Sequence, residues 1–367
     1  MNNERRQLQM PFLCCALVLL CSCIFCWEAL GRPVRVQLNN SLDIVPFLTA
    51  CGFFCGCILC TLMRRASLCL RLLSACLLFG VGLTLASVTQ VSPLYFCLTF
   101  CLIGGAGAGM TFCLCVRVVF CWMPARRGLG FGALCGSAFL SIALVDATVP
   151  HLFQDPSFGW HGAYLLFGLI AATALFVAAF TLRLPDNISE ISGSHAMRPM
   201  ELVCLVCLAA AFAAVWRTGT DYAIINSHHA GSAAALGALA SGFAVQQHKT
   251  GKLLIPCAWL MTLAAVSFVV AVSSFRRDLA ASFLMLCCFS GGMLSMLCLY
   301  GLGTSVARCS TAVCGASLLL IILCAAASVP QVFAISISRF VLPLGCMLGA
   351  FAAVVLTALY WPGKHTA

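Results

Sequence analysis

Charged residues are scarce in this sequence, and acidic residues are the scarcest of them. Only 8% of the 367 residues are charged, and ten Asp and Glu stand against twenty Lys and Arg. Such a chain has too few charges to cover a surface that faces water, which excludes an ordinary soluble protein. Because 62% of the residues are hydrophobic, most of the chain is expected to lie in a lipid bilayer.

Motifs for catalysis and nucleotide binding are also missing. The sequence has no Gly-x-x-x-x-Gly-Lys-Ser/Thr loop, no His-Glu-x-x-His and no Gly-x-Ser-x-Gly. We therefore expect neither an enzyme nor an ATP-driven pump, and neither a cofactor nor a metal. A net charge of +10 would suggest nucleic acid in a soluble protein. Here orientation in the membrane explains it better, and no nucleic-acid partner is expected.

Long apolar runs predict an all-α polytopic membrane protein, because a helix needs about 20 apolar residues to cross a bilayer. The eighth run is short and rich in Ala and Gly, and without it the count would fall to eleven. The predicted spans are 11–31, 42–63, 67–89, 94–121, 128–150, 160–183, 201–222, 231–246, 253–273, 279–302, 310–329 and 334–361.

One long polar stretch, 184–199, divides these twelve spans into six and six. This predicts two six-helix bundles with pseudo-two-fold symmetry, 1–183 and 201–367, joined by a cytoplasmic linker at 184–200. With the N-terminus in the cytoplasm, fourteen of the twenty Lys and Arg fall on the inner side. Both termini are then expected in the cytoplasm, in a bacterial inner membrane.

The 27 cysteines lie almost entirely within the predicted spans. A free cysteine behaves as a small hydrophobic residue, so a packing role is favoured over disulfides or metal. The alternative is a pathway for a soft metal such as copper(I). Pairs such as Cys113 and Cys115 point about 200° apart on a helix, so they could bind a metal together only where the helix is broken.

The stretch from Trp122 to Ser137 places an Arg-Arg turn between two glycine-bearing spans, and IGGAGAG precedes it at Ile103–Gly109. This order resembles the fourth-to-fifth helix region of major facilitator superfamily transporters, and most of all the monocarboxylate-type members. FGWHGAYLLFG, which begins at Phe158, is similar to the start of their sixth helix. The resemblance implies a secondary transporter that moves a small molecule by alternating access.

In that superfamily the loops after the second and eighth helices carry a Gly-x-x-x-Asp-Arg-x-Gly-Arg-Arg signature that latches the halves at the cytoplasmic face. Here Gly56 and Gly242 occupy comparable positions, while Cys60-Thr61 and Gln246-Gln247 replace the Asp-Arg pair. The basic positions are preserved and the acid is lost at both loops, which puts an ordinary latch in doubt.

The resemblance then implies a cytoplasmic gate built from Arg64, Arg65, Arg126 and Arg127. With the loop acids gone, we expect Arg126 and Arg127 to pair with acids of the linker region, which are Asp186, Glu190 and Glu201.

Two pairs of glycines are predicted to pack helices closely. Gly105 and Gly109 are four residues apart, as are Gly132 and Gly136, so each pair lies on one helix face. Static packing is the favoured interpretation, and the alternative is that these faces slide as the halves rock.

Ionisable residues inside spans are the candidates for substrate and coupling sites. Arg217 and Asp221 are four residues apart, and Glu28 occupies the corresponding level of the first span. We hypothesise that the three form an outer gate or a proton-sensitive network; alternatively they mark helix ends. Arg117 is expected to reach the interface, or else to serve as a cavity cation for an anionic substrate.

Three further groups carry weaker signals. Asp146 and Arg339 are expected to have capping or interface roles near the outer ends of their spans. His228 and His229 are predicted in an outer loop, where two ligands without a third are poor evidence for zinc.

Together these patterns predict a monomeric secondary active transporter in contact with the lipid bilayer. A proton is the expected coupling ion, because Glu28, Asp146 and Asp221 are available carboxylates. The excess of arginine over acid within the spans favours an organic anion. The alternatives are a multidrug or lipophile exporter and a membrane sensor that transports nothing.

Overall fold

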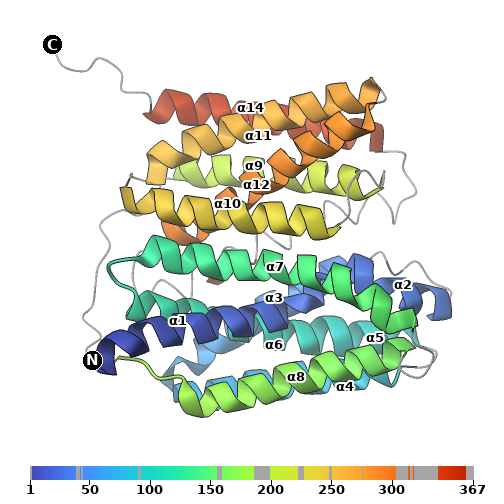
Figure 1. Ribbon diagram of the computed structural model, residues 1–367, viewed down its shortest axis with the longest axis vertical. Coiled ribbons are helices and arrows are strands. Elements are labelled where there is room, and N and C mark those ends of the chain that lie inside the picture. The colour runs from blue at the N-terminus through green and yellow to red at the C-terminus, as the bar shows by residue number, and fades with distance from the viewer. Residues whose placement is uncertain are drawn as a thin grey trace.

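The chain folds entirely into helices in the residues that the structure, a computed structural model, describes. Figure 1 shows them running side by side along one direction. The described residues are 2–38, 42, 44–89, 92–154, 159–185, 199–221, 227–247, 250–274, 276–302, 313–314, 317 and 338–360.

The N-terminal half contains six long spans, two of which are interrupted. Their parts are α1 (Asn2–Cys21), η1 (Ser22–Phe25), α2 (Trp27–Leu38), α3 (Val45–Leu62), η2 (Met63–Arg65), α4 (Leu68–Ser87), α5 (Pro93–Phe96), η3 (Cys97–Gly104), α6 (Gly105–Trp122), α7 (Arg127–Gln154) and α8 (Gly159–Thr181).

The described part of the C-terminal half contributes five further long helices. They are α9 (Pro199–Asp221), α10 (Ser227–Gln247), α11 (Thr250–Ser273), α12 (Arg277–Leu302) and α14 (Ser338–Tyr360). In Figure 1 these five lie together on one side, and α1 to α8 lie on the other.

Among the described residues, eight helical stretches are long and apolar enough to cross a membrane. Six are the spans of the N-terminal half, and the other two are Leu253–Ser273 and Arg277–Gly301. Shorter apolar stretches occur in α9, at Val203–Ala214, and in α14, at Leu344–Leu359. The chain is therefore an integral membrane protein with several spans. Six and five give eleven described spans, because the span expected at 310–329 lies mostly outside the described residues.

Local sequence explains several of the helix ends. Ser67 caps α4, its hydroxyl accepting a hydrogen bond from the Leu70 backbone N–H at 3.2 Å. Ser92 caps α5 in the same way, with Pro93 in the first turn, where the missing N–H of proline costs nothing. α6 ends at Trp122, two residues before Pro124, which disfavours helical backbone in the residue before it.

Two of the predicted spans are interrupted in the structure. The first passes from α1 through a 3-10 turn, η1, into α2, and the fourth passes from α5 through a π-helical segment, η3, into α6. Both breaks belong to the N-terminal half and are in contact with each other. Gly104, the last residue of η3, faces the Ile24 side chain of η1.

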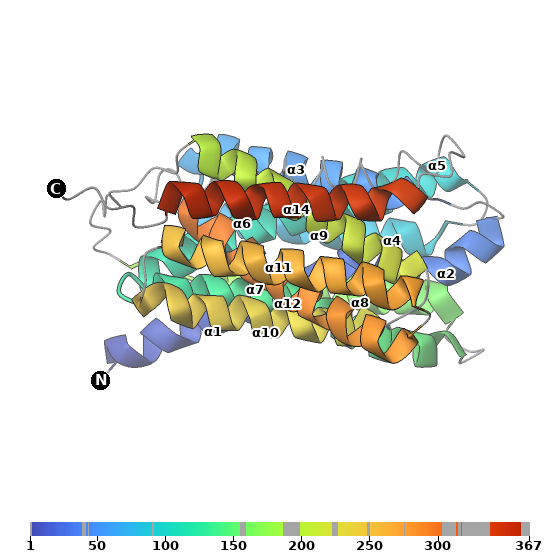
Figure 2. The same ribbon diagram turned by 90° about the horizontal axis from the view of Figure 1, so that it is seen from above.

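The two ends of the molecule are called the Arg126 end and the Asp146 end. At the Arg126 end α6 is followed by α7, and at the opposite, Asp146 end α7 finishes and α10 begins. Figures 1 and 2 show that α1 begins and α14 finishes at the Arg126 end.

Helices α3 and α6 pack through a reciprocal glycine contact. A Cβ atom added to Gly56 would lie 2.0 Å from the Ala106 carbonyl oxygen, and one added to Gly109 would lie 2.0 Å from the Phe53 carbonyl oxygen. Each glycine therefore meets the carbonyl three residues before the other glycine. Only glycine lets two helix backbones approach this closely.

The C-terminal half repeats this contact between α10 and α12. A Cβ atom added to Gly237 would lie 1.9 Å from the Phe289 carbonyl oxygen, and one added to Gly292 would lie 1.8 Å from the Ala234 carbonyl oxygen. The spacing of three residues between the glycine and the contacted carbonyl is the same as in the N-terminal half. A helix pair in each half is thus built on one pattern.

Gly242, which was matched to Gly56 from sequence, contacts the other half of the chain. A Cβ atom added to it would lie 2.8 Å from the Gly128 carbonyl oxygen of α7. Gly56 instead meets Ala106 within its own half, so the two matched glycines have different kinds of neighbour. Their match rests on sequence position.

Alanine at Gly109 is expected to lower the melting temperature of the purified protein by several degrees. The added methyl group meets backbone, which cannot rotate away, and such overpacking costs about 1–3 kcal/mol. Gly292→Ala should lower the melting temperature for the same reason, because its added methyl group also meets backbone. Gly349→Ala is the control, since its Cβ would meet nothing closer than 3.4 Å. Equal thermal stability of the Gly109 and Gly349 variants in detergent would contradict this contact.

Candidate functional site

The break in the first span exposes irregular backbone inside the N-terminal half. η1 covers Ser22–Phe25, and Cys26 after it has φ −84° and ψ 43°, outside the helical region. Ser22 is buried, with 7% of its surface exposed. Interrupted spans are where membrane proteins place irregular backbone toward a solute or ion path, because lipid does not tolerate it.

An aromatic cluster lies beside this break. Phe96 and Phe100 stack with ring centroids 5.1 Å apart, and Trp27 and Tyr164 contact both rings. The Tyr164 hydroxyl donates to the Leu30 carbonyl oxygen at 3.2 Å. The indole N–H of Trp27 is buried without a hydrogen-bond partner among the described residues. The cluster thus fixes α2 against η3 and leaves one polar group unused next to the break.

A seam of small residues joins the two halves along α7 and α10. A Cβ atom added to Gly132 would lie 2.7 Å from the Ala238 carbonyl oxygen and 3.0 Å from the Gly242 Cα. Near the Asp146 end, one added to Gly231 would lie 2.8 Å from the Phe139 carbonyl oxygen. The two helices, one from each half, are therefore packed backbone to backbone near both ends of the seam.

The two glycine pairs singled out from sequence have different neighbours. Gly105 and Gly109 pack α6 against α3 within the N-terminal half, whereas Gly132 and Gly136 face α10 of the other half. The first pair fits the interpretation of static packing. Any movement between the halves would change the contacts of the second pair. At Gly136 an added Cβ would meet nothing closer than 3.4 Å, so that position is less crowded.

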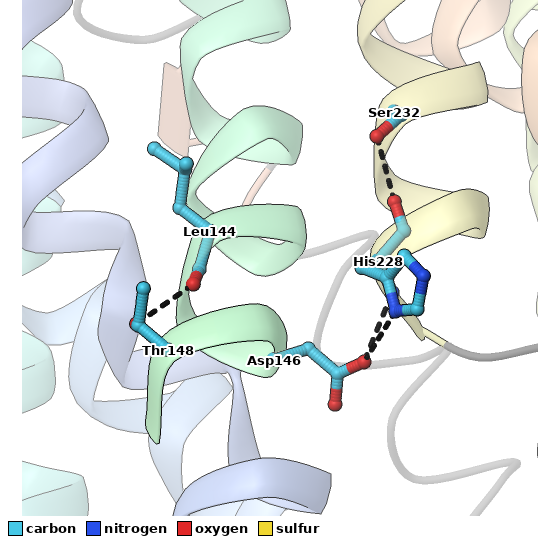
Figure 3. A network of polar contacts seen from close by, with 5 residues as sticks. All are labelled: Leu144, Asp146, Thr148, His228 and Ser232. Atoms are coloured by element: carbon cyan, nitrogen blue, oxygen red, sulfur yellow. Dashed lines mark hydrogen bonds and ion pairs between the residues drawn. The ribbon is translucent and has the colours of Figure 1, made fainter. Parts of the chain in front are cut away.

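Asp146 and His228 connect the halves at the Asp146 end of the seam (Figure 3). One carboxylate oxygen, Oδ2, accepts from the His228 backbone N–H at 3.1 Å and lies 3.3 Å from the imidazole Nδ1. The Asp146 side chain is 12% exposed and the His228 side chain 36%. An acid on α7 thus caps the first turn of α10, as the interface role predicted for Asp146 requires.

The predicted loop around the two histidines is part of a helix in the structure. α10 begins at Ser227, four residues before the predicted span, so His228 and His229 lie in its first turn. Their rings are 3.9 Å apart. The described residues contain no group of three or more His, Cys, Asp and Glu side chains that could hold a metal.

Two arginines lie together inside the N-terminal half at the Arg126 end. Arg71 of α4 is 4% exposed and interacts with Arg117 of α6, which is half-buried. The Nε–H of each guanidinium is buried without a partner in the described part of the chain. The groups that face them are the thiols of Cys60 and Cys113. Two cations therefore share a site in which the described residues provide no carboxylate.

Cys60 stands where the superfamily signature has its acid, and the structure shows what such an acid would contact. The Cys60 thiol lies next to the Cys113 thiol and to both Arg71 and Arg117. Cys57, one turn earlier, lies close to Cys314 and Ser317 of the other half. This cluster thus adjoins the boundary between the halves. Sequence reasoning singled out Cys60 and Arg117, but it counted Arg71 only among the fourteen basic residues of the inner side.

The four arginines of the expected gate have different surroundings in the structure. Arg64, Arg65 and Arg126 are exposed, while Arg127 is half-buried with its guanidinium 4.3 Å from the centroid of the Phe120 ring. The structure does not describe the side chains of the linker acids proposed as partners. It describes only the backbone of Glu28 in α2, of Arg217 and Asp221 in α9, and of Arg339 in α14.

The end of α6 is instead held by a neutral contact. The indole N–H of Trp122 donates to the Arg183 carbonyl oxygen, just after α8, at 2.7 Å. This links the start of the WMPARRG stretch to the sixth span.

All 25 cysteines described by the structure are free thiols.

No family model matches the chain, and no curated protein matches it in sequence. Solved structures do match it over nearly its full length. One is the major facilitator superfamily proton:xylose symporter XylE bound to 6-bromo-6-deoxy-D-glucose, with 13% identity, a TM-score of 0.71 and 96% of each chain covered. Another is the major facilitator superfamily transporter FucP in the outward conformation, with 13% identity, a TM-score of 0.59, and 94% and 97% covered.

Proposed function

We propose that this chain, which has the fold of the major facilitator superfamily, is a secondary active transporter that moves a small solute by alternating access. The full-length match to XylE, described as a proton:xylose symporter, is the observation that carries the proposal. The glycine-lined seam supports it, because two bundles that rock against each other need a smooth contact between them.

The proposed architecture is that of twelve spans in two bundles, 1–183 and 201–367, related by pseudo-two-fold symmetry and joined by a cytoplasmic linker at 184–200. The repeated glycine contact supports this symmetry. The Arg126 end is proposed to face the cytoplasm, because basic residues gather there. The protein would act as a monomer in a bacterial inner membrane, with both termini in the cytoplasm.

An organic anion is the proposed class of solute. Arg71 and Arg117 form a pair of cations with buried, unpartnered Nε–H groups, and the described residues offer them no carboxylate. A guanidinium binds a carboxylate through two parallel hydrogen bonds, so an anionic solute leaving or entering at the Arg126 end would be attracted to this pair.

A proton is the proposed coupling ion. Glu28 and Asp221, together with Arg217, remain proposed members of an outer network, and Asp146 is the carboxylate whose surroundings the structure describes. Its contact with His228 crosses from one half to the other. A titratable pair in that position can link proton binding to the movement of the halves.

Uptake into proteoliposomes with an imposed pH gradient tests this function. We expect a small monocarboxylate to accumulate more than a pentose or a lipophilic cation, and a protonophore to abolish the accumulation. Export of the lipophilic cation would instead indicate a multidrug transporter. Stabilisation of the purified protein by a solute that it does not carry would indicate a sensor.

Replacement of Arg117 by glutamine is expected to lower the uptake of the anion about fivefold. A hydrogen bond to a charged group contributes about 1.5–3 kcal/mol, reduced here because Arg117 is only half-buried. Arg183→Gln is the matched control, since Arg183 is exposed at the same end. Equal uptake by the two variants would remove the argument for an anionic solute.

A further inference from the structure

The Asp146 end of the seam holds a contact whose strength depends on a proton. Oδ2 of Asp146 accepts the backbone N–H of His228 whatever the protonation state of the ring, at 3.1 Å. The imidazole Nδ1, 3.3 Å from the same oxygen, adds a full positive charge only when the ring is protonated. The contact between α7 and α10 is therefore stronger at low pH, where the ring is charged. At high pH the ion pair is lost and the hydrogen bond from the His228 backbone remains.

The other titratable groups at this end are placed differently. Cys26, after η1, faces Asp146 from the first span. His229 contacts the His228 ring on its outer side and is exposed. His151 of α7 and Arg277 and Asp278 of α12 are exposed. Among the described residues, His228 is thus the cationic partner of Asp146.

We infer that Asp146 and His228 form a proton-binding site that closes the seam at the Asp146 end. In the closed seam the bound proton stands between carboxylate and imidazole. When α7 and α10 separate, the imidazolium loses its partner and the carboxylate loses both donors. Linkage then requires that closing this end favours proton binding and that proton binding favours closing, by the same factor.

This inference rests on the proposed function for its use in transport. A proton bound at the Asp146 end would drive that end to close, so the step that hides a solute from this side would be coupled to external pH. Histidine is the side chain that changes its charge most readily within the range of physiological gradients, about pH 5 to 8.

The test measures a distance across the Asp146 end as a function of pH, in purified protein without solute. Spin labels would be introduced as non-canonical amino acids at Leu94 and Leu279, both exposed, because the 27 cysteines rule out thiol labelling. Between pH 8 and pH 5.5 we expect the ratio of the closed to the open population to rise about fivefold, as a partly exposed ion pair allows.

Three variants identify the site. Asp146→Asn and His228→Gln should abolish the pH response, because neither can form the ion pair. His228→Lys, which stays charged over this range, should keep this end closed at every pH. No pH response in the unchanged protein, or an unchanged response in Asp146→Asn or His228→Gln, would overturn the inference.

Two further variants test other titratable groups at this end. His151→Gln and Asp278→Asn, both at exposed positions, should keep the pH response, and loss of the response in either would place the proton there instead. These distances need no solute, so failure of the inference is distinct from failure of the proposed function. A chain that transports nothing could still show the switch, and a transporter could lack it.

Discussion

Alanine at Gly132 is expected to reduce solute uptake at least about fivefold, while alanine at Gly136, one turn along the same helix, leaves uptake almost unchanged. The two positions lie on one face of α7 and differ in the space before them. A Cβ atom at Gly132 would lie 2.7 Å from the backbone oxygen of Ala238, and one at Gly136 would meet nothing closer than 3.4 Å.

The size of this effect follows from a free-energy cost that applies to one conformation of the transporter, the one closed at the Arg126 end. Overpacking costs about 1–3 kcal/mol, and here it would apply only while α7 and α10 touch near the Arg126 end. A bias of that size shifts a two-state equilibrium about 5–150-fold. A transporter must visit both states in each cycle, so a population held open at this end slows turnover.

Uptake and a distance measurement together check the prediction. Labels at Leu62 and Phe243, both exposed, should report a wider Arg126 end in Gly132→Ala than in Gly136→Ala. The thermal stability of both variants should exceed that of Gly109→Ala, whose crowded contact lies within one half and is present in every conformation. If Gly132→Ala transports as well as Gly136→Ala, the seam does not open at this position.

The sequence predicts spans well because apolar length is a local property. The interruptions in the first and fourth spans were missed because they depend on tertiary neighbours. A Cβ atom at Gly82 of α4 would lie 2.5 Å from the Gly104 backbone nitrogen, and Gly104 in turn faces Ile24. The π-helical segment that ends at Gly104 thus fits between two segments from other parts of the chain, and no window of sequence contains that information.

The same limit applies to the candidate site. Spacing placed Gly132 and Gly136 on one helix face, but it could not show that this face meets the other half of the molecule. Asp146 and His228 were each noticed as separate residues. They are 82 positions apart, and their contact follows from the antiparallel packing of α7 and α10, which brings the end of one helix to the start of the other.

An aspartate at Cys60 is expected to stabilise the folded protein by on the order of 2 kcal/mol, because its carboxylate would lie between two guanidinium groups. Cys60 is 3% exposed and adjoins both Arg71 and Arg117, which have no carboxylate partner among the described side chains. A buried charge without a partner destabilises a fold, so supplying the missing anion should raise the melting temperature. Cys60→Asn, with a similar shape and no charge, is the control.

The same substitution should reduce uptake of an anionic solute about tenfold, because the new carboxylate would occupy the guanidinium groups that the solute is proposed to meet. It should leave binding of neutral compounds unaffected. In an Arg71→Gln, Arg117→Gln background the gain in stability should disappear, which a double-mutant cycle of melting temperatures would measure. If Cys60→Asp is no more stable than Cys60→Asn, the arginines already have a counter-charge. The linker acids Asp186 and Glu190 and the neighbouring Glu201 would then be the first residues to substitute.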